Sequence, residues 1–186
     1  METRDFVLLA YDAFGGEIQG KTKLQKTIYF LGVMSGNVDE LGYMPHYYGP
    51  YSPEVADVNA ELKSLGFLEE SVAGGGAVNP EGFEIVRYDY RLTDAGRRIA
   101  EQRRKRHADE WKALREKAAI MEKAGDLGYM ELSAAAKAYF VLKQHGRKTT
   151  LKTVREMASR FGWSLGKEEL DKAAHFLKTI ALVTLS

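Results

Sequence analysis

The sequence predicts a mainly helical protein with a small β-hairpin and two helical units. Apolar residues recur at intervals of three and four over most of the chain, which is typical of amphipathic helices. Residues 83–92 instead alternate between apolar and charged side chains, which predicts a half-buried strand. Residues 6–16 and 139–146 are weakly alike, which indicates two units that begin with related helices.

The first 65 residues predict three helices. Residues 4–14 and 21–34 each place apolar side chains on one helical face, and glycines separate the two segments. Residues 35–51 are rich in glycine and tyrosine and predict a loop. The Ser-Pro-Glu sequence at 52–54 is a typical helix start, because serine caps, proline suits the first turn and glutamate complements the helix dipole.

A hairpin follows the three helices. Residues 67–72 and 83–92 predict its two strands, and glycines at 74–76 open the loop between them. Three helices followed by a hairpin is the order of a winged helix-turn-helix. We therefore expect residues 1–93 to form a winged-helix-like domain with the hairpin as its wing.

The rest of the chain predicts helices and one short strand. Thr93 caps a helix, and residues 95–124 form either one long helix or two, because Asp109 is placed to cap a second. We assign residues 94–131 to this connection and residues 132–186 to a C-terminal helix-turn-helix-like unit. That unit is expected to hold helices over 134–145, 151–161 and 170–180 and a strand over 181–185.

Composition excludes several classes of protein. The chain has 186 residues, a net charge of +1 and no cysteine, so disulfides, thiolate catalysis and cysteine-bound zinc are excluded. Acidic residues surround the short apolar run near the N-terminus, which is wrong for a signal peptide. No segment of about 18 apolar residues occurs. We therefore expect a cytoplasmic protein without a membrane partner.

Residues 15–22, GGEIQGKT, match the phosphate-loop pattern G-x-x-x-x-G-K-[ST]. A working phosphate loop needs a buried strand before it and further strand–helix alternation after it. The preceding residues have a helical period, and the later chain shows no such alternation. We predict a turn between two helices, with Lys21 starting the second helix and no cofactor. The alternative is a nucleotide-binding enzyme that uses Gly20, Lys21 and Thr22.

Three short motifs occur in order: KLQK at 23–26, YGPYS at 48–52 and YxLTxxG at 90–96. They resemble the YwgA-like proteins of bacteria and archaea and, more distantly, the Panacea (SocA-like) antitoxin domain. The resemblance covers roughly residues 1–100. It implies a helical, winged-helix-like domain without enzymatic activity, with roles near gene regulation, toxin neutralisation or defence. It supplies no catalytic residue.

Charge is unevenly distributed. The first 70 residues carry a net charge of −6, and Glu54, Asp57 and Glu61 are expected on the open face of the third helix. An acidic face repels DNA phosphates, so we do not expect this helix to read a groove. Segments 87–107 and 143–160 each carry +5, which suits either phosphate contacts or pairing with the acidic residues. The candidate nucleic-acid contacts are Arg97, Arg98, Arg103, Arg104, Lys105, Arg106, Lys148, Lys152 and Arg155.

The loop before the third helix is unusually aromatic. It forms either a ligand or partner site, because tyrosines offer flat area and hydroxyls, or a segment packed on the core. The four histidines lack metal-ligand spacing, and no catalytic motif occurs. We therefore expect no metal and no catalytic residue. The candidate ligand or partner residues are Tyr43, His46, Tyr47, Tyr48 and Tyr51.

The sequence as a whole predicts a non-enzymatic regulatory or interaction protein. One interpretation is a transcriptional regulator that contacts the DNA backbone. Another is an antitoxin-like or defence-associated module that binds a protein partner such as a toxin. Both interpretations are compatible with a homodimer.

Overall fold

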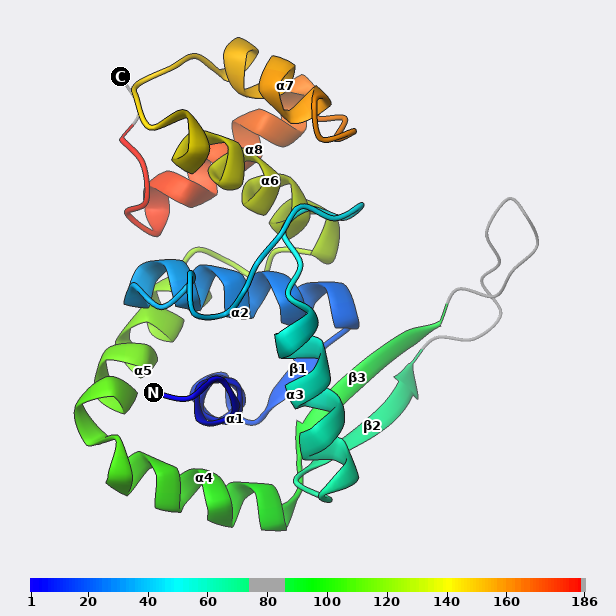
Figure 1. Ribbon diagram of the computed structural model, residues 1–186, viewed down its shortest axis with the longest axis vertical. Coiled ribbons are helices and arrows are strands. Elements are labelled where there is room, and N and C mark those ends of the chain that lie inside the picture. The colour runs from blue at the N-terminus through cyan, green and yellow to red at the C-terminus, as the bar shows by residue number, and fades with distance from the viewer. Residues whose placement is uncertain (74–85, 185–186) are drawn as a thin grey trace.

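The computed structural model describes residues 1–73 and 86–184, and within them it is mainly helical with a small antiparallel sheet (Figure 1). The predicted helical class is therefore confirmed. The elements run in the order α1 (Thr3–Ala13), β1 (Glu17–Gln19), α2 (Lys21–Ser35), α3 (Pro53–Ser64), β2 (Leu68–Ala73), β3 (Arg87–Leu92), α4 (Asp94–Arg106), α5 (Ala108–Lys123), α6 (Tyr129–His145), α7 (Leu151–Ser159) and α8 (Lys167–Thr179).

The sheet has the strand order β1-β3-β2, with β3 antiparallel to both neighbours. Strand β1 was not expected, because three residues are too few to show alternation. It forms by pairing with β3, where Ile18 lies opposite Tyr90. Helix α2 does begin at Lys21, as predicted. The predicted glycine loop at 74–76 and the predicted strand residues 83–85 lie outside the described residues.

Helix α1 is the central element of the core. Every residue from Phe6 to Ala13 except Asp12 is buried. Figure 1 shows α1 end-on, with α2, α3, α4 and α5 arranged around it. Helices α3, α4 and α5 all pack against α1. The chain after the sheet therefore contributes to the same core as the chain before it.

The YxLTxxG motif makes the start of α4. The Oγ1 atom of Thr93 accepts a hydrogen bond from the Gly96 amide at 3.0 Å and donates one to the Gly66 carbonyl at 2.6 Å. Gly96 faces the Phe67 carbonyl oxygen so closely that an added Cβ would lie 2.1 Å from it. The glycine thus lets the first turn of α4 pack directly on the backbone that joins α3 to β2.

Residues 95–124 form two helices, which settles the alternative left open by the sequence. The break is at His107, with φ −120° and ψ 49°. Its ring lies 3.1 Å from an Asp5 carboxylate oxygen on α1. Asp109 lies in the first turn of α5 and does not cap it. The bend lets both helices follow the surface of α1 (Figure 1).

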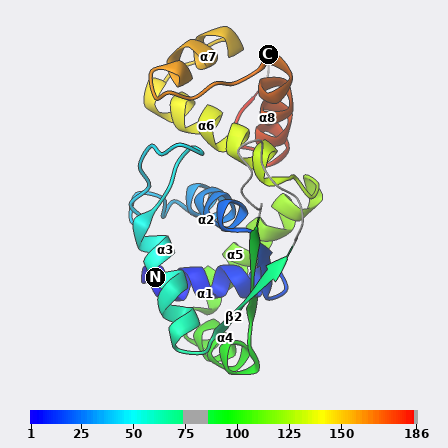
Figure 2. The same cartoon turned by 90° about the vertical axis from the view of Figure 1, so that its right-hand side faces the viewer.

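Helices α6 to α8 form the part of the molecule farthest from α4 (Figure 2). Phe176 on α8 meets Phe30 on α2 edge-on, with ring centroids 5.2 Å apart. The strand predicted over 181–185 is wrong for residues 181–184, because Ala181 has φ +58° and turns the chain back. Residue 185 lies outside the described part of the chain. No helix within residues 1–73 and 86–184 is long and apolar enough to cross a membrane.

Candidate functional site

The central arginines of α4 are engaged within the molecule. Arg103 Nε lies 2.9 Å from an Asp5 oxygen, and Arg104 Nε lies 3.4 Å from an Asp12 oxygen. The Arg104 guanidinium also lies over the Trp111 ring, 5.6 Å from its centroid. Both carboxylates belong to α1, so these arginines hold α4 against the core. Of the two interpretations of the basic segment 87–107, phosphate contacts or pairing with acidic residues of the chain, pairing describes these two arginines.

The other basic residues of α4 are more exposed. Arg97 lies against the backbone of Gly16, and Lys105 pairs with Glu101 one turn away at 2.9 Å. Arg98 and Arg106 are exposed and form no ion pair with any residue that the structure describes. The charge that α4 offers to a partner is therefore smaller than its sequence suggests, because Arg103 and Arg104 are engaged with α1.

We expect Arg103→Gln to lower the free energy of unfolding by about 2 kcal/mol, because it removes an ion-pair partner from the buried Asp5 carboxylate. Urea denaturation measures this change. Arg106→Gln is the matched control, since Arg106 is exposed and one turn away on the same helix. Equal stability of the two variants would contradict the structural role of Arg103 and return it to the nucleic-acid candidates.

The basic residues around α7 form no ion pair with another element in the described part of the chain, although Arg147 donates to the His145 ring of α6 at 3.3 Å. Lys148 and Arg155 are exposed, and Lys152 has only Glu156 on the same helix nearby, at 4.0 Å, within the described residues. Arg147 before the helix and Arg160 after it are also exposed. Figure 1 places α7 and α4 at opposite ends of the molecule. The predicted nucleic-acid residues therefore fall on two separate surfaces, and the one around α7 keeps its charge available.

The tyrosine-rich loop, residues 43–51, divides into a packed part and an open part. Tyr43 donates its hydroxyl to the Gln25 carbonyl at 2.7 Å, and its ring packs edge-on against Tyr29. Tyr47 and Tyr48 are 75% and 47% exposed, so they are not core residues. Tyr51 is half-buried and packs on the His46 ring at 4.9 Å. Packing on the core thus explains Tyr43 but leaves the outer tyrosines unexplained.

Two motifs of the family resemblance meet at this loop. The Gln25 side chain exchanges two hydrogen bonds with the Ser52 backbone, at 2.9 and 3.0 Å. Lys26 Nζ donates to the Pro50 carbonyl at 2.7 Å. Trp163, between α7 and α8, donates to the His46 carbonyl at 2.7 Å. The loop is therefore fixed to α2 on one side and to the C-terminal helices on the other.

Between this loop, α2, α3 and the sheet lies a cavity of about 340 Å³, here called the lysine cavity. Its aromatic walls come from His46, Tyr48, Tyr51 and Tyr90. It brings together residues from four separate elements, which the sequence does not show to be neighbours. Its charged and amide side chains are those of Lys21, Gln25, Lys26, Asn59, Lys63 and Glu70.

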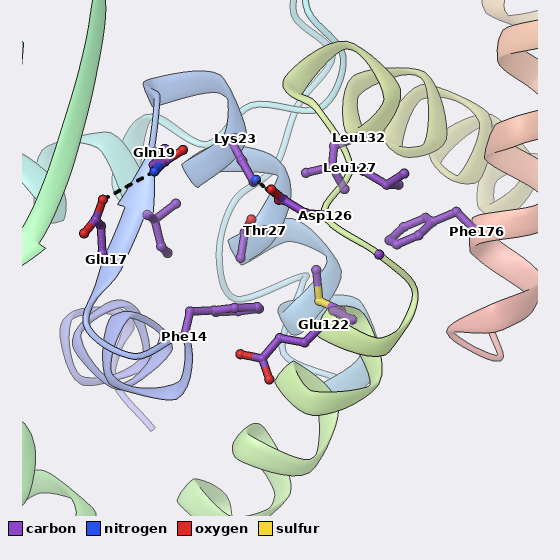
Figure 3. Close-up of a pocket in the computed structure, with 13 residues that line it drawn as sticks. Phe14, Glu17, Gln19, Lys23, Thr27, Glu122, Asp126, Leu127, Leu132 and Phe176 are labelled. Atoms are coloured by element: carbon purple, nitrogen blue, oxygen red, sulfur yellow. Dashed lines mark hydrogen bonds and ion pairs between the residues drawn. The ribbon is translucent and has the colours of Figure 1, made fainter. Parts of the chain in front are cut away.

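A second cavity, of about 520 Å³, lies between β1, α2, α5, α6 and α8 (Figure 3). Its lining is largely apolar and includes Phe14, Leu127 and Phe176. Figure 3 shows Lys23 pointing at Asp126, with which it forms an ion pair. Because its charged groups are paired or exposed, this cavity offers less chemistry than the lysine cavity.

The phosphate-loop match has a different geometry from the one its chemistry requires. Residues 17–19 form the extended strand β1 where the pattern requires a loop that wraps around the phosphates. The predicted turn is wrong over these three residues. Lys21 Nζ lies 4.2 Å from the centroid of the Tyr88 ring. No three His, Asp or Glu side chains of the described residues are grouped to hold a metal ion.

The chain is similar to the uncharacterized protein YwgA of Bacillus subtilis (strain 168), with 41% identity over 81 residues. The match covers 44% of this chain and 44% of YwgA, which is less than half of either protein. No family model matches the sequence. The match supports the resemblance to YwgA-like proteins, while the likeness to the Panacea domain stays a prediction.

Proposed function

We propose that this chain is a non-enzymatic regulatory protein with a winged-helix-like N-terminal part and a nucleic-acid contact surface around α7. The element order α1-β1-α2-α3-β2-β3 and the strand order β1-β3-β2 support a winged-helix arrangement, with β2 and β3 as the wing. A conventional recognition role for α3 is disfavoured by its exposed carboxylates. Glu61 pairs with Arg4 at 2.7 Å, and Asp57 stays exposed to solvent.

The observation that carries the nucleic-acid proposal is the available charge around α7. Arg147, Lys148, Lys152, Arg155 and Arg160 are all exposed on one short helix and its flanking turns. Nucleic-acid affinity is dominated by neutralising phosphates, and cations already paired with carboxylates contribute little to it. Contacts of this kind position a protein on the backbone without reading sequence. We therefore propose backbone-driven binding with weak sequence preference.

The triple variant Lys148→Gln, Lys152→Gln, Arg155→Gln is expected to weaken binding to all duplexes about equally. Each lost phosphate contact should reduce the slope of log K against log salt by about 0.9. Filter binding of several unrelated duplexes at a series of salt concentrations measures both effects.

The matched control removes three exposed lysines elsewhere, Lys112 and Lys123 on α5 and Lys178 on α8. It changes the net charge equally but should leave the salt slope unchanged. Asp57→Asn should bind as well as the original protein or better. A triple α7 variant with an unchanged slope would contradict the proposed surface, and loss of one specific site in Asp57→Asn would make α3 a recognition helix.

A protein-binding module is the second candidate, favoured by one observation. Three apolar side chains form an exposed tip of the tyrosine-rich loop. Their exposed fractions are 51% for Met44, 75% for Tyr47 and 47% for Tyr48. Clusters of exposed aromatic and methionine side chains are typical of protein interaction sites. If the original protein binds no duplex even at low salt, this candidate, with a basic partner such as a toxin, becomes the leading one.

A further inference from the structure

We propose that the lysine cavity binds a small organic anion in which a carboxylate or phosphate group is attached to a flat ring. This inference goes beyond the nucleic-acid proposal, because it concerns a different surface and a different ligand. It depends on one buried cation, on the balance of charge at the rim and on the shape of the walls.

The buried cation is Lys26, which is only 2% exposed. An ammonium group has three hydrogens, yet the Pro50 carbonyl is the one acceptor that the described residues place within hydrogen-bond range. No carboxylate pairs with it in that part of the chain. Burial, together with the nearby Lys137 of α6, lowers the pKa of Lys26 to about 7. A buried charge without a counter-ion is unfavourable, so an anion that entered the cavity would supply the missing partner.

The rim of the cavity is also more positive than negative. Lys21 and Lys63 line it, and the single carboxylate among its lining residues is that of Glu70. That carboxylate already accepts from Lys63 at 3.2 Å, and burial together with the nearby Glu70 raises the pKa of the Tyr90 phenol. Because the Glu70 carboxylate is already paired with Lys63, it repels an entering anion less, and the net charge of the rim stays positive.

One amide donor is available inside. Asn59 is 7% exposed, and its Oδ1 accepts the Tyr11 hydroxyl at 2.6 Å. Its Nδ2 donates to no other residue that the structure describes. This nitrogen is not among the fully buried atoms without a partner, so it stays available to donate to a ligand oxygen in the cavity.

The walls favour a flat ring beside the anionic group. His46 and Tyr51 pack against each other at 4.9 Å, and the half-exposed Tyr48 lies at the same end of the loop. Ala56 and Ala60 of α3 also line the cavity, and their small side chains leave space in it. A volume of about 340 Å³ suits a single-ring or two-ring ligand.

Isothermal titration calorimetry with benzoate and phenyl phosphate tests the proposal, and uncharged benzamide is the control probe. At least one anion should bind at least about tenfold more tightly than benzamide, since a charge-assisted hydrogen bond is gained. The probe that binds more tightly, benzoate or phenyl phosphate, shows whether the cavity prefers a carboxylate or a phosphate group. Inorganic phosphate binding as tightly as phenyl phosphate would overturn the requirement for a ring.

Three variants separate binding from folding. Lys26→Met keeps the apolar stem and removes the charge, and it should weaken anion binding by about tenfold without weakening benzamide binding. Tyr48→Ala should weaken all three probes, whereas Tyr47→Ala should not, because Tyr47 is exposed beside it and does not line the cavity.

If Lys26→Met fails to fold, Lys63→Met at the rim takes its place, and it too should weaken anion binding without weakening benzamide binding. Anions that bind no more tightly than benzamide would overturn the proposal. So would a folded Lys26→Met or Lys63→Met variant that binds anions as the original protein does.

Discussion

Replacing Gly96 by alanine is expected to lower the free energy of unfolding by about 3 kcal/mol, at the upper end of the cost of overpacking. The new methyl group would lie 2.1 Å from the Phe67 carbonyl oxygen, a rigid backbone atom that already accepts the Thr93 amide. Either the first turn of α4 or the connection to β2 must shift. Urea denaturation followed by circular dichroism measures the change.

Gly128→Ala is the matched control for this substitution. Gly128 stands at the N-cap of α6 with an ordinary negative φ, and within 4 Å its added Cβ would meet only the Glu131 carboxylate, at 3.7 Å. We expect a loss of less than about 1 kcal/mol there, the usual difference at a helix cap. If both variants lost the same stability, close packing on Phe67 would not be the reason for the glycine in this motif.

The second large effect is a rise in stability with pH that comes from Lys26. Its pKa is about 7 in the folded protein, against 10.5 for an unperturbed lysine. Between these two values the unfolded chain holds the proton more often than the folded one, so the free energy of unfolding increases as pH rises. Between pH 7 and about 9.5 the expected gain is about 3 kcal/mol.

Urea denaturation at fixed pH values from 6 to about 9.5 measures this slope. Higher pH is avoided because burial raises the pKa of Tyr11, Tyr29 and Tyr43, whose earlier ionisation in the unfolded chain lowers stability. Lys26→Met should flatten the profile. Lys137→Met should leave most of the rise in stability with pH, although the pKa of Lys137 is also lowered by burial. A slope that survives in Lys26→Met would contradict the assignment.

Local patterns predicted most of the helices but not the contacts between distant segments. The caps at Ser52 and Thr93 and the start of α2 follow from neighbouring residues, and the structure has them. Strand β1 depends on partners about 70 residues later, and the break at His107 depends on Asp5, so neither shows in a local pattern.

Charge counting has the same weakness at the candidate sites. It treats Arg103 and Lys152 alike, although one pairs with a carboxylate of α1 and the other stays in solvent. Lys26 was quoted as part of a motif, but nothing in the sequence shows that its ammonium is buried beside Pro50. The tyrosines of the loop look equivalent in sequence and differ only once α2 and the C-terminal helices are in place.

The contact between Trp163 and the tyrosine-rich loop makes the protein its own spectroscopic probe. The chain has two tryptophans, of which Trp163 is 2% exposed and donates its indole hydrogen to the His46 carbonyl. In a Trp111→Phe background all tryptophan emission comes from this one junction. A red shift and easier quenching by iodide would then report separation of the loop from the C-terminal helices, in real time and without a label.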